Sequence, residues 1–180
     1  MRHAEADARA NAISLLKVLP MWELKDMIYP RLYPLHAMED DVGVRDASNR
    51  LPMPVVLQLS AEYMERGGLY LLHNALYMLL YVTKDLNPSI MQDLFGIGTA
   101  SYDEIKNGPI DLEKLETPVS KKVRNIVRGL RSCHPRYLVL IVVKEDGPLR
   151  GEFMKHLYED KYNGSMSYYE MLTKLQTEMK

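Results

Sequence analysis

Side chains that could carry out chemistry are spread thinly through this sequence. The histidines fall in different segments, and no two have the spacing of a zinc-binding motif such as HExxH: His3, His36, His73, His134 and His156. Cys133 is the single cysteine, so neither a Cys-rich zinc cluster nor an intrachain disulfide can form. We therefore expect no metal and no cofactor in these residues, and a reducing compartment.

Three short motifs could suggest catalysis, and each has a simpler interpretation. Ser14 and Lys17 have the spacing of a serine nucleophile and its lysine base, but they lie in an amphipathic helical pattern where such a match arises by chance. The Gly-x-Gly at 96–98 lacks the third glycine and the following helix of a dinucleotide site. Cys133 and His134 end a helical pattern, where adjacent side chains diverge. No catalytic residue is predicted, and we expect that the chain is not an enzyme.

The charge balance and the apolar runs exclude other classes of function. Lysine and arginine together number 23 and aspartate and glutamate 24, giving a formal net charge of -1. No strong positive field therefore attracts the chain to nucleic acid. The longest apolar runs, 76–82 and 138–143, are far shorter than the roughly 20 residues of a membrane span.

The stretch Gly68–Val82 is the element around which we expect the fold to be organised. Its two arms, 69–72 and 76–82, are almost wholly apolar, and His73, Asn74 and Ala75 interrupt them. Two buried strands joined by a turn at Asn74 explain this pattern. One buried helix of the same length is the alternative, because periodicity does not separate the two for short apolar runs.

The remaining patterns mix helices and strands without strict alternation. Helices are predicted at 5–19, Met21–Ile28, Pro88–Phe95, Pro118–His134, Leu149–Glu159 and Ser167–Lys180, and strands at 55–59 and 137–143. The prolines at 30 and 34 predict an extended strap, and 97–117 a long loop. This order predicts a mixed α/β (α+β) fold, with a central sheet flanked by helices and the terminal helices packed together as a small helical subdomain.

Two features indicate partners. Basic residues follow one side of the 118–134 helix and form either a solvated face or a contact surface for acidic groups or lipid headgroups: Lys121, Lys122, Arg124, Arg128 and Arg131. Large apolar residues between Leu15 and Tyr33 exceed what two short helices can cover. We therefore expect a further part of a longer chain to pack on them.

Several strings resemble, in order and spacing, the C-terminal end of the cargo-binding subunit of the COPII vesicle coat, the Sec-twenty-four family. They include the proline-containing strap at Tyr29–Leu35, LQLS at 57–60, LFG at 94–96 and the segment from Glu159 to Leu172. The resemblance implies the end of a helical domain at 1–35, a gelsolin-like domain at 36–148, and helices at 149–180 that return to the helical part. Its zinc site would lie only in an upstream part outside this sequence.

The resemblance also implies a function. It predicts a non-enzymatic COPII component in transport from endoplasmic reticulum to Golgi, cytoplasmic and peripheral on the endoplasmic reticulum membrane and on vesicles. Its partners would be the GTPase-activating coat subunit and cargo membrane proteins, met through the full-length protein. The alternative is a calcium-dependent actin-binding gelsolin-type module, but His73 and Asn74 stand at the hairpin turn, where such modules carry an acidic residue.

Overall fold

The computed structural model describes residue 10 and residues 13–96, 102–161 and 166–179. Its centre is a five-stranded sheet in the order β1-β2-β3-β5-β4, in which β3 and β5 are parallel and the other pairs antiparallel. The strands are β1 Arg31–Pro34, β2 Leu69–His73, β3 Met78–Val82, β4 Gly108–Pro109 and β5 Leu140–Lys144. The α-helices are α2 Met21–Ile28, α3 Pro88–Phe95, α4 Pro118–Ser132, α5 Arg150–Met154 and α6 Tyr168–Glu178. The expected mixed architecture is confirmed.

The predicted hairpin lies inside the sheet. Strands β2 and β3 pair in register from Leu69 with Val82 to His73 with Met78, and every residue of both strands is buried. The side chain of Asn74 closes the turn, where its Oδ1 accepts from the amides of Leu76 and Tyr77 at 3.1 and 3.0 Å. The reading of this stretch as one helix is therefore wrong, and the Asn74 oxygen is already used within the turn.

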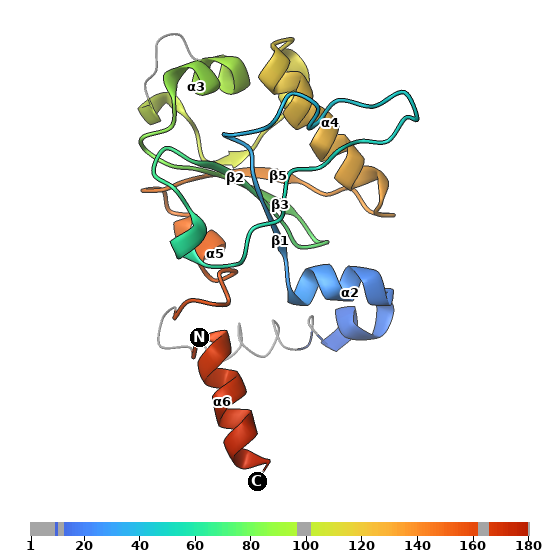
Figure 1. Cartoon of the computed structure of the whole chain (residues 1–180), viewed down its shortest axis with the longest axis vertical. Coiled ribbons are helices and arrows are strands. Elements are labelled where there is room, and N and C mark those ends of the chain that lie inside the picture. Colours follow the sequence, from blue (N-terminus) through green and yellow to red (C-terminus); the bar gives the residue numbers. More distant parts are fainter. Residues whose placement is uncertain (1–9, 11–12, 97–101, 162–165, 180) are drawn as a thin grey trace.

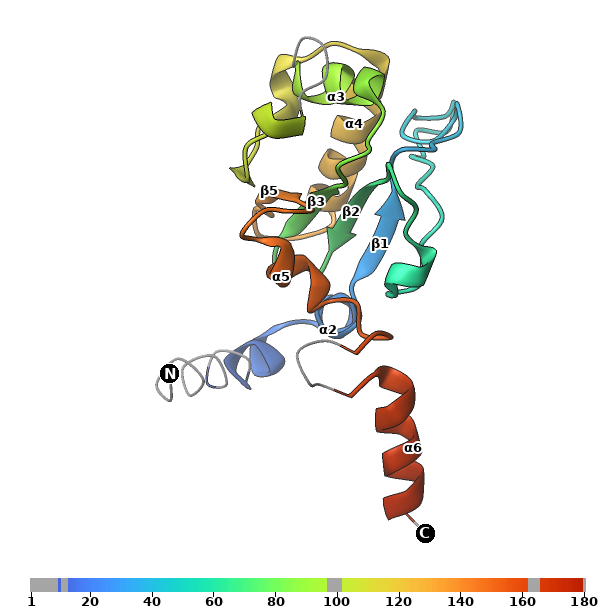
Figure 2. The same ribbon diagram turned by 90° about the vertical axis from the view of Figure 1, so that its left-hand side faces the viewer.

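Helices cover both faces of the sheet (Figures 1 and 2). On one face, α3 and α4 pack through Leu94 and Ile126 against Leu80 and Val142. On the other, Phe153 of α5 stacks on Tyr81 of β3 at 4.2 Å between ring centroids. The strand residues alternate between these two cores, which explains why their sequence is apolar at every position.

Helix ends follow the signals in the sequence. Asn87 caps α3 by accepting from the amide of Ser89, and α3 ends at Gly96, which has the left-handed φ of 68° common at helix C-termini. Ser167 and Glu170 form the predicted capping box of α6. Within the described part of the chain, no helix is both long and apolar enough to cross a lipid bilayer.

The edge strand is a correction to the sequence prediction. The strap between Pro30 and Pro34 forms β1, paired with β2, whereas the predicted strand at 55–59 contributes a single bridge, from Leu57 to Leu32. Val55 is 81% exposed, so the alternation at 55–59 does not mark one buried face. Proline has no backbone N–H, so it is tolerated at the ends of an edge strand, where that hydrogen bond to a neighbouring strand is not needed.

Other boundaries also differ from the predictions. The strand predicted at 137–143 begins at Leu140, and the helix predicted at 149–159 is confined to Arg150–Met154. The predicted loop contains the short strand β4, which pairs with β5. The helix expected at 5–19 lies partly outside the described residues, and residues 13–18 are helical. Helix α6 has no buried residue and extends away from the sheet (Figure 2).

Candidate functional site: a buried polar cluster between α2 and the sheet

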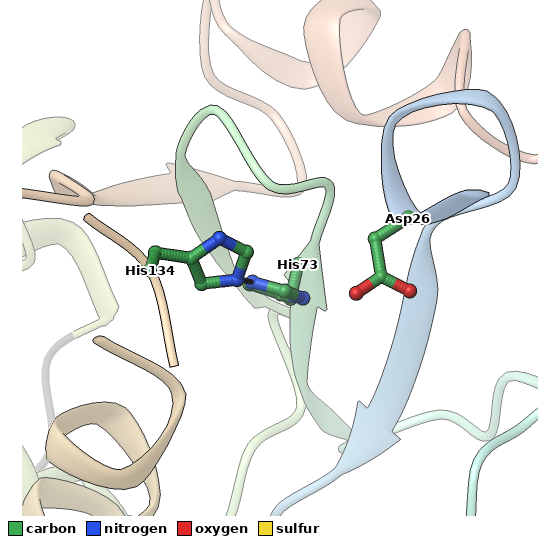
Figure 3. A group of neighbouring side chains, drawn as sticks. All are labelled: Asp26, His73 and His134. Atoms are coloured by element: carbon green, nitrogen blue, oxygen red, sulfur yellow. Dashed lines mark hydrogen bonds between the residues drawn. The ribbon is translucent and has the colours of Figure 1, made fainter. Parts of the chain in front are cut away.

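Two histidines from distant parts of the chain meet at the end of the hairpin. His73 is the last residue of β2, and His134 lies just after α4. Their Nε2 atoms are 2.9 Å apart (Figure 3). His73 is 1% exposed and so is the side chain of His134, so the pair is shielded from bulk water.

Helix α2 supplies two carboxylates to the same place. Glu23 and Asp26 are three residues apart, which puts them on one face of the helix, and they are the buried residues of α2. Glu23 lies 3.1 Å from Nδ1 of His134 and 3.5 Å from Nη2 of Arg136, and Asp26 lies 2.8 Å from Nε of Arg31. Each buried carboxylate therefore has a cationic partner, as buried charges require.

The hydrogen bonds fix the tautomers of both rings. A carboxylate only accepts, so Nδ1 of His134 donates to Glu23, and its Nε2 is then the acceptor for Nε2–H of His73. Nδ1 of His73 is left with a lone pair, and among the described residues it has no hydrogen-bond partner. Figure 3 shows His73 between His134 and Asp26, with this second nitrogen on the Asp26 side.

The surroundings keep His73 neutral. Burial lowers its pKa from 6.5 to about 4, with a further lowering by His134 and an opposing effect of Asp26. The indole of Trp22 covers the cluster from α2, with its ring centroid 4.9 Å from that of His134. Neutral imidazoles beside a carboxylate form a metal-binding donor set, whereas the oxygen-rich shell that calcium prefers is not present in this cluster.

The basic residues predicted as a partner surface are all engaged within the chain. Lys121 pairs with Glu116, Lys122 donates to the carbonyl of Glu39, and Arg128 pairs with Glu113. Arg131 donates to the carbonyl of Leu138 and lies over the ring of Tyr137.

Arg124 is a correction to the predicted basic side. It is 8% exposed and donates to the carbonyls of Glu113 and Leu115 and to the carboxylate of Glu116. These hydrogen bonds join residues 113–116, which precede α4, to the helix. Cys133 is exposed while the neighbouring His134 side chain is buried, so the two do not share one environment.

An apolar groove is the second feature of note. It lies where the end of α2 meets the start of α6, has a volume of about 450 Å³, and is lined by Ile28, Tyr29, Tyr158, Met166, Tyr168 and Met171. Ile28 of α2 and Tyr168 and Met171 of α6 line this groove together, and no residue of α6 is buried. We call it the α2–α6 groove.

Other large apolar side chains on the two helices are also exposed. Trp22 is 44% exposed on α2, and Leu172 and Leu175 are 44% and 46% exposed on α6.

Comparison with known proteins identifies relatives along nearly the whole chain. No family model matches it. Human protein transport protein Sec24A is 27% identical over 177 residues, covering 98% of this chain and 16% of the relative. Protein transport protein SEC24 of Yarrowia lipolytica is 34% identical over 180 residues, covering 97% of this chain and 19% of the relative.

A solved structure has the same fold. The crystal structure of the human COPII-coat protein Sec24c matches with a TM-score of 0.75 and 32% identity, over 87% of this chain and 19% of that one. The chain thus spans about a fifth or less of the length of these relatives. Both sequence and fold agree, and the chain belongs to the Sec24 family.

Proposed function

We propose that the chain acts as part of a non-enzymatic COPII coat component that serves protein transport from endoplasmic reticulum to Golgi. The observation that carries this proposal is the likeness to Sec24c, in which 32% identity accompanies a common fold over 87% of the chain. In this proposal the protein is cytoplasmic and peripheral on the endoplasmic reticulum membrane and on vesicles. The zinc site that the family resemblance implies would lie upstream of these residues.

The buried cluster fits a structural role better than a catalytic one. Its two histidines and two carboxylates are enclosed by Trp22, Arg31 and Arg136, which leaves no exposed nucleophile or base among them. The α2–α6 groove, in contrast, presents an apolar surface to solvent. We propose that the chain contributes to the coat as a rigid scaffold with this exposed face.

The partners proposed for the complete protein are the GTPase-activating coat subunit and cargo membrane proteins. Pull-downs from cytosol with the purified chain and with a longer form that restores the upstream residues would test this, with immunoblots for that subunit and for actin. Capture of the coat subunit by the longer form supports the proposal. Calcium-dependent capture of actin, or capture of neither protein by either form, would contradict it.

A further inference from the structure

We propose that Asp26, His73 and His134 form a binding site for one divalent transition-metal ion of the zinc type. One candidate ligand atom from each residue lies within 4.8 Å of the others. The three residues come from α2, from β2 and from the segment after α4, so the ion would join three parts of the fold (Figure 3). This inference does not depend on the proposed transport function.

The hydrogen bond between His134 and Glu23 prepares His134 as a ligand. Metal-binding histidines commonly donate their second ring N–H to a carboxylate, which fixes the tautomer and raises the basicity of the ligating nitrogen. Glu23 is fully buried and accepts from Nδ1 of His134 at 3.1 Å. The lone pair of Nε2 is therefore directed into the cluster, toward His73.

His73 has a nitrogen without a partner. Its Nδ1 is buried and makes no hydrogen bond among the described residues. Burying a polar atom without a hydrogen-bond partner costs free energy. With the proton on Nε2, as the bond to His134 requires, His73 can present the lone pair of Nδ1 to an ion. An ion beside the ring would satisfy this group.

Asp26 completes the donor set. Arg31 contacts its Oδ1 at 2.8 Å, and Oδ2 has no hydrogen bond to the rest of the described chain. Two imidazole nitrogens and one carboxylate oxygen suit Zn²⁺, which takes such ligands at about 2.0–2.2 Å, better than they suit Ca²⁺ or Mg²⁺. The candidate ligand atoms lie within 4.8 Å of one another, so the side chains must move closer together to reach these distances.

Binding to the 180-residue chain would be measured with two probes. Zn²⁺ is expected to raise the melting temperature by about 5–11 °C at a hundredfold excess over its Kd. Co²⁺, which has visible bands that depend on coordination, is expected to show a four-coordinate spectrum that Zn²⁺ abolishes. A folded chain with neither response would overturn the proposal.

Variants assign the response to the cluster. His73→Gln and Asp26→Asn should each weaken Zn²⁺ binding by at least tenfold, and Glu23→Gln by about 10–100-fold through loss of the second hydrogen bond of His134. The matched control is His36→Gln, because His36 contacts the backbone of Leu69 instead of the cluster. If His73→Gln does not fold, Asp26→Asn decides: unchanged affinity in that variant would overturn the site.

Discussion

Nδ1 of His134 lies 3.1 Å from Oε1 of Glu23, although 111 residues separate them in the sequence. This bond joins the segment after α4 to α2, and both side chains are about 1% exposed or less. Together with the Asp26–Arg31 pair, it anchors α2 to the sheet domain.

Glu23→Gln should destabilise the chain. The substitution keeps the shape of the side chain but removes the charge that faces His134 and Arg136, so we expect a loss of about 1–3 kcal/mol in the free energy of unfolding. Urea denaturation measures this loss. Lys174→Ala, which removes an exposed pair with Glu178, is the control and should change stability by less than about 0.5 kcal/mol. Equal effects of the two variants would show that the buried contact is unimportant.

Leu140→Asp should unfold the domain. Leu140 is 1% exposed in β5, between β3 and β4, and an unpaired charge at this position costs several kcal/mol. Circular dichroism and a melting curve provide the readout. Val55→Asp is matched to it, since Val55 is 81% exposed, and should melt like the parent chain. An unchanged melting curve for Leu140→Asp would refute the placement of β5.

His156 should make the chain sensitive to mild acid. Burial lowers its pKa to about 4, with Lys155 adding to the shift and Glu152 opposing it. The ring lies against two hydroxyls, 2.9 Å from Tyr77 and 3.4 Å from Tyr158. In the unfolded chain the ring takes up a proton near pH 6.5, so the unfolded state binds protons more readily.

The sign of the pH effect follows from this difference. The stabilisation by neutral His156 is fully present above about pH 6.5 and is lost as the pH falls toward 4, by up to about 3 kcal/mol. Urea midpoints at several pH values, compared between the parent chain and His156→Gln, isolate this contribution. If the stabilities of the two proteins change with pH in parallel, His156 makes no such contribution.

Removal of residues 167–180 should leave the stability of the remaining chain nearly unchanged. No residue of α6 is buried, so its loss removes little apolar contact apart from one wall of the α2–α6 groove. We expect melting temperatures within about 2 °C of each other. A drop of 10 °C would show that α6 packs on the sheet domain more extensively than the structure indicates.

Much of the fold could be predicted from short-range signals. The apolar arms of the β2–β3 hairpin, the single stripe of α4, the Asn87 and Gly96 ends of α3 and the α6 capping box all agree with the structure. Each depends on residues within a few positions of one another. The edge strand was missed because its pairing with β2 joins residues about 40 positions apart, which no local pattern encodes.

The polar cluster could not be predicted for the same reason. Glu23, His73 and His134 belong to three separate elements, and none of their spacings matches a known ligand motif. The signal that was available was the apolar arm of β2 ending in a histidine, a polar residue at a position where the strand pattern expects burial. Arg124 was misplaced because its guanidinium, though polar, is buried through hydrogen bonds to carbonyls.

The central claim is that this chain can function as the corresponding segment of a Sec24 protein. Exchanging the two segments tests this claim most directly. The 180 residues would replace the matching segment of Yarrowia lipolytica SEC24, in cells where that chimera is the only copy, and arrival of a secretory cargo at the Golgi would be timed. We predict transport close to that of cells with the parental protein. A chimera that is folded and abundant but leaves the cargo in the endoplasmic reticulum would contradict the account.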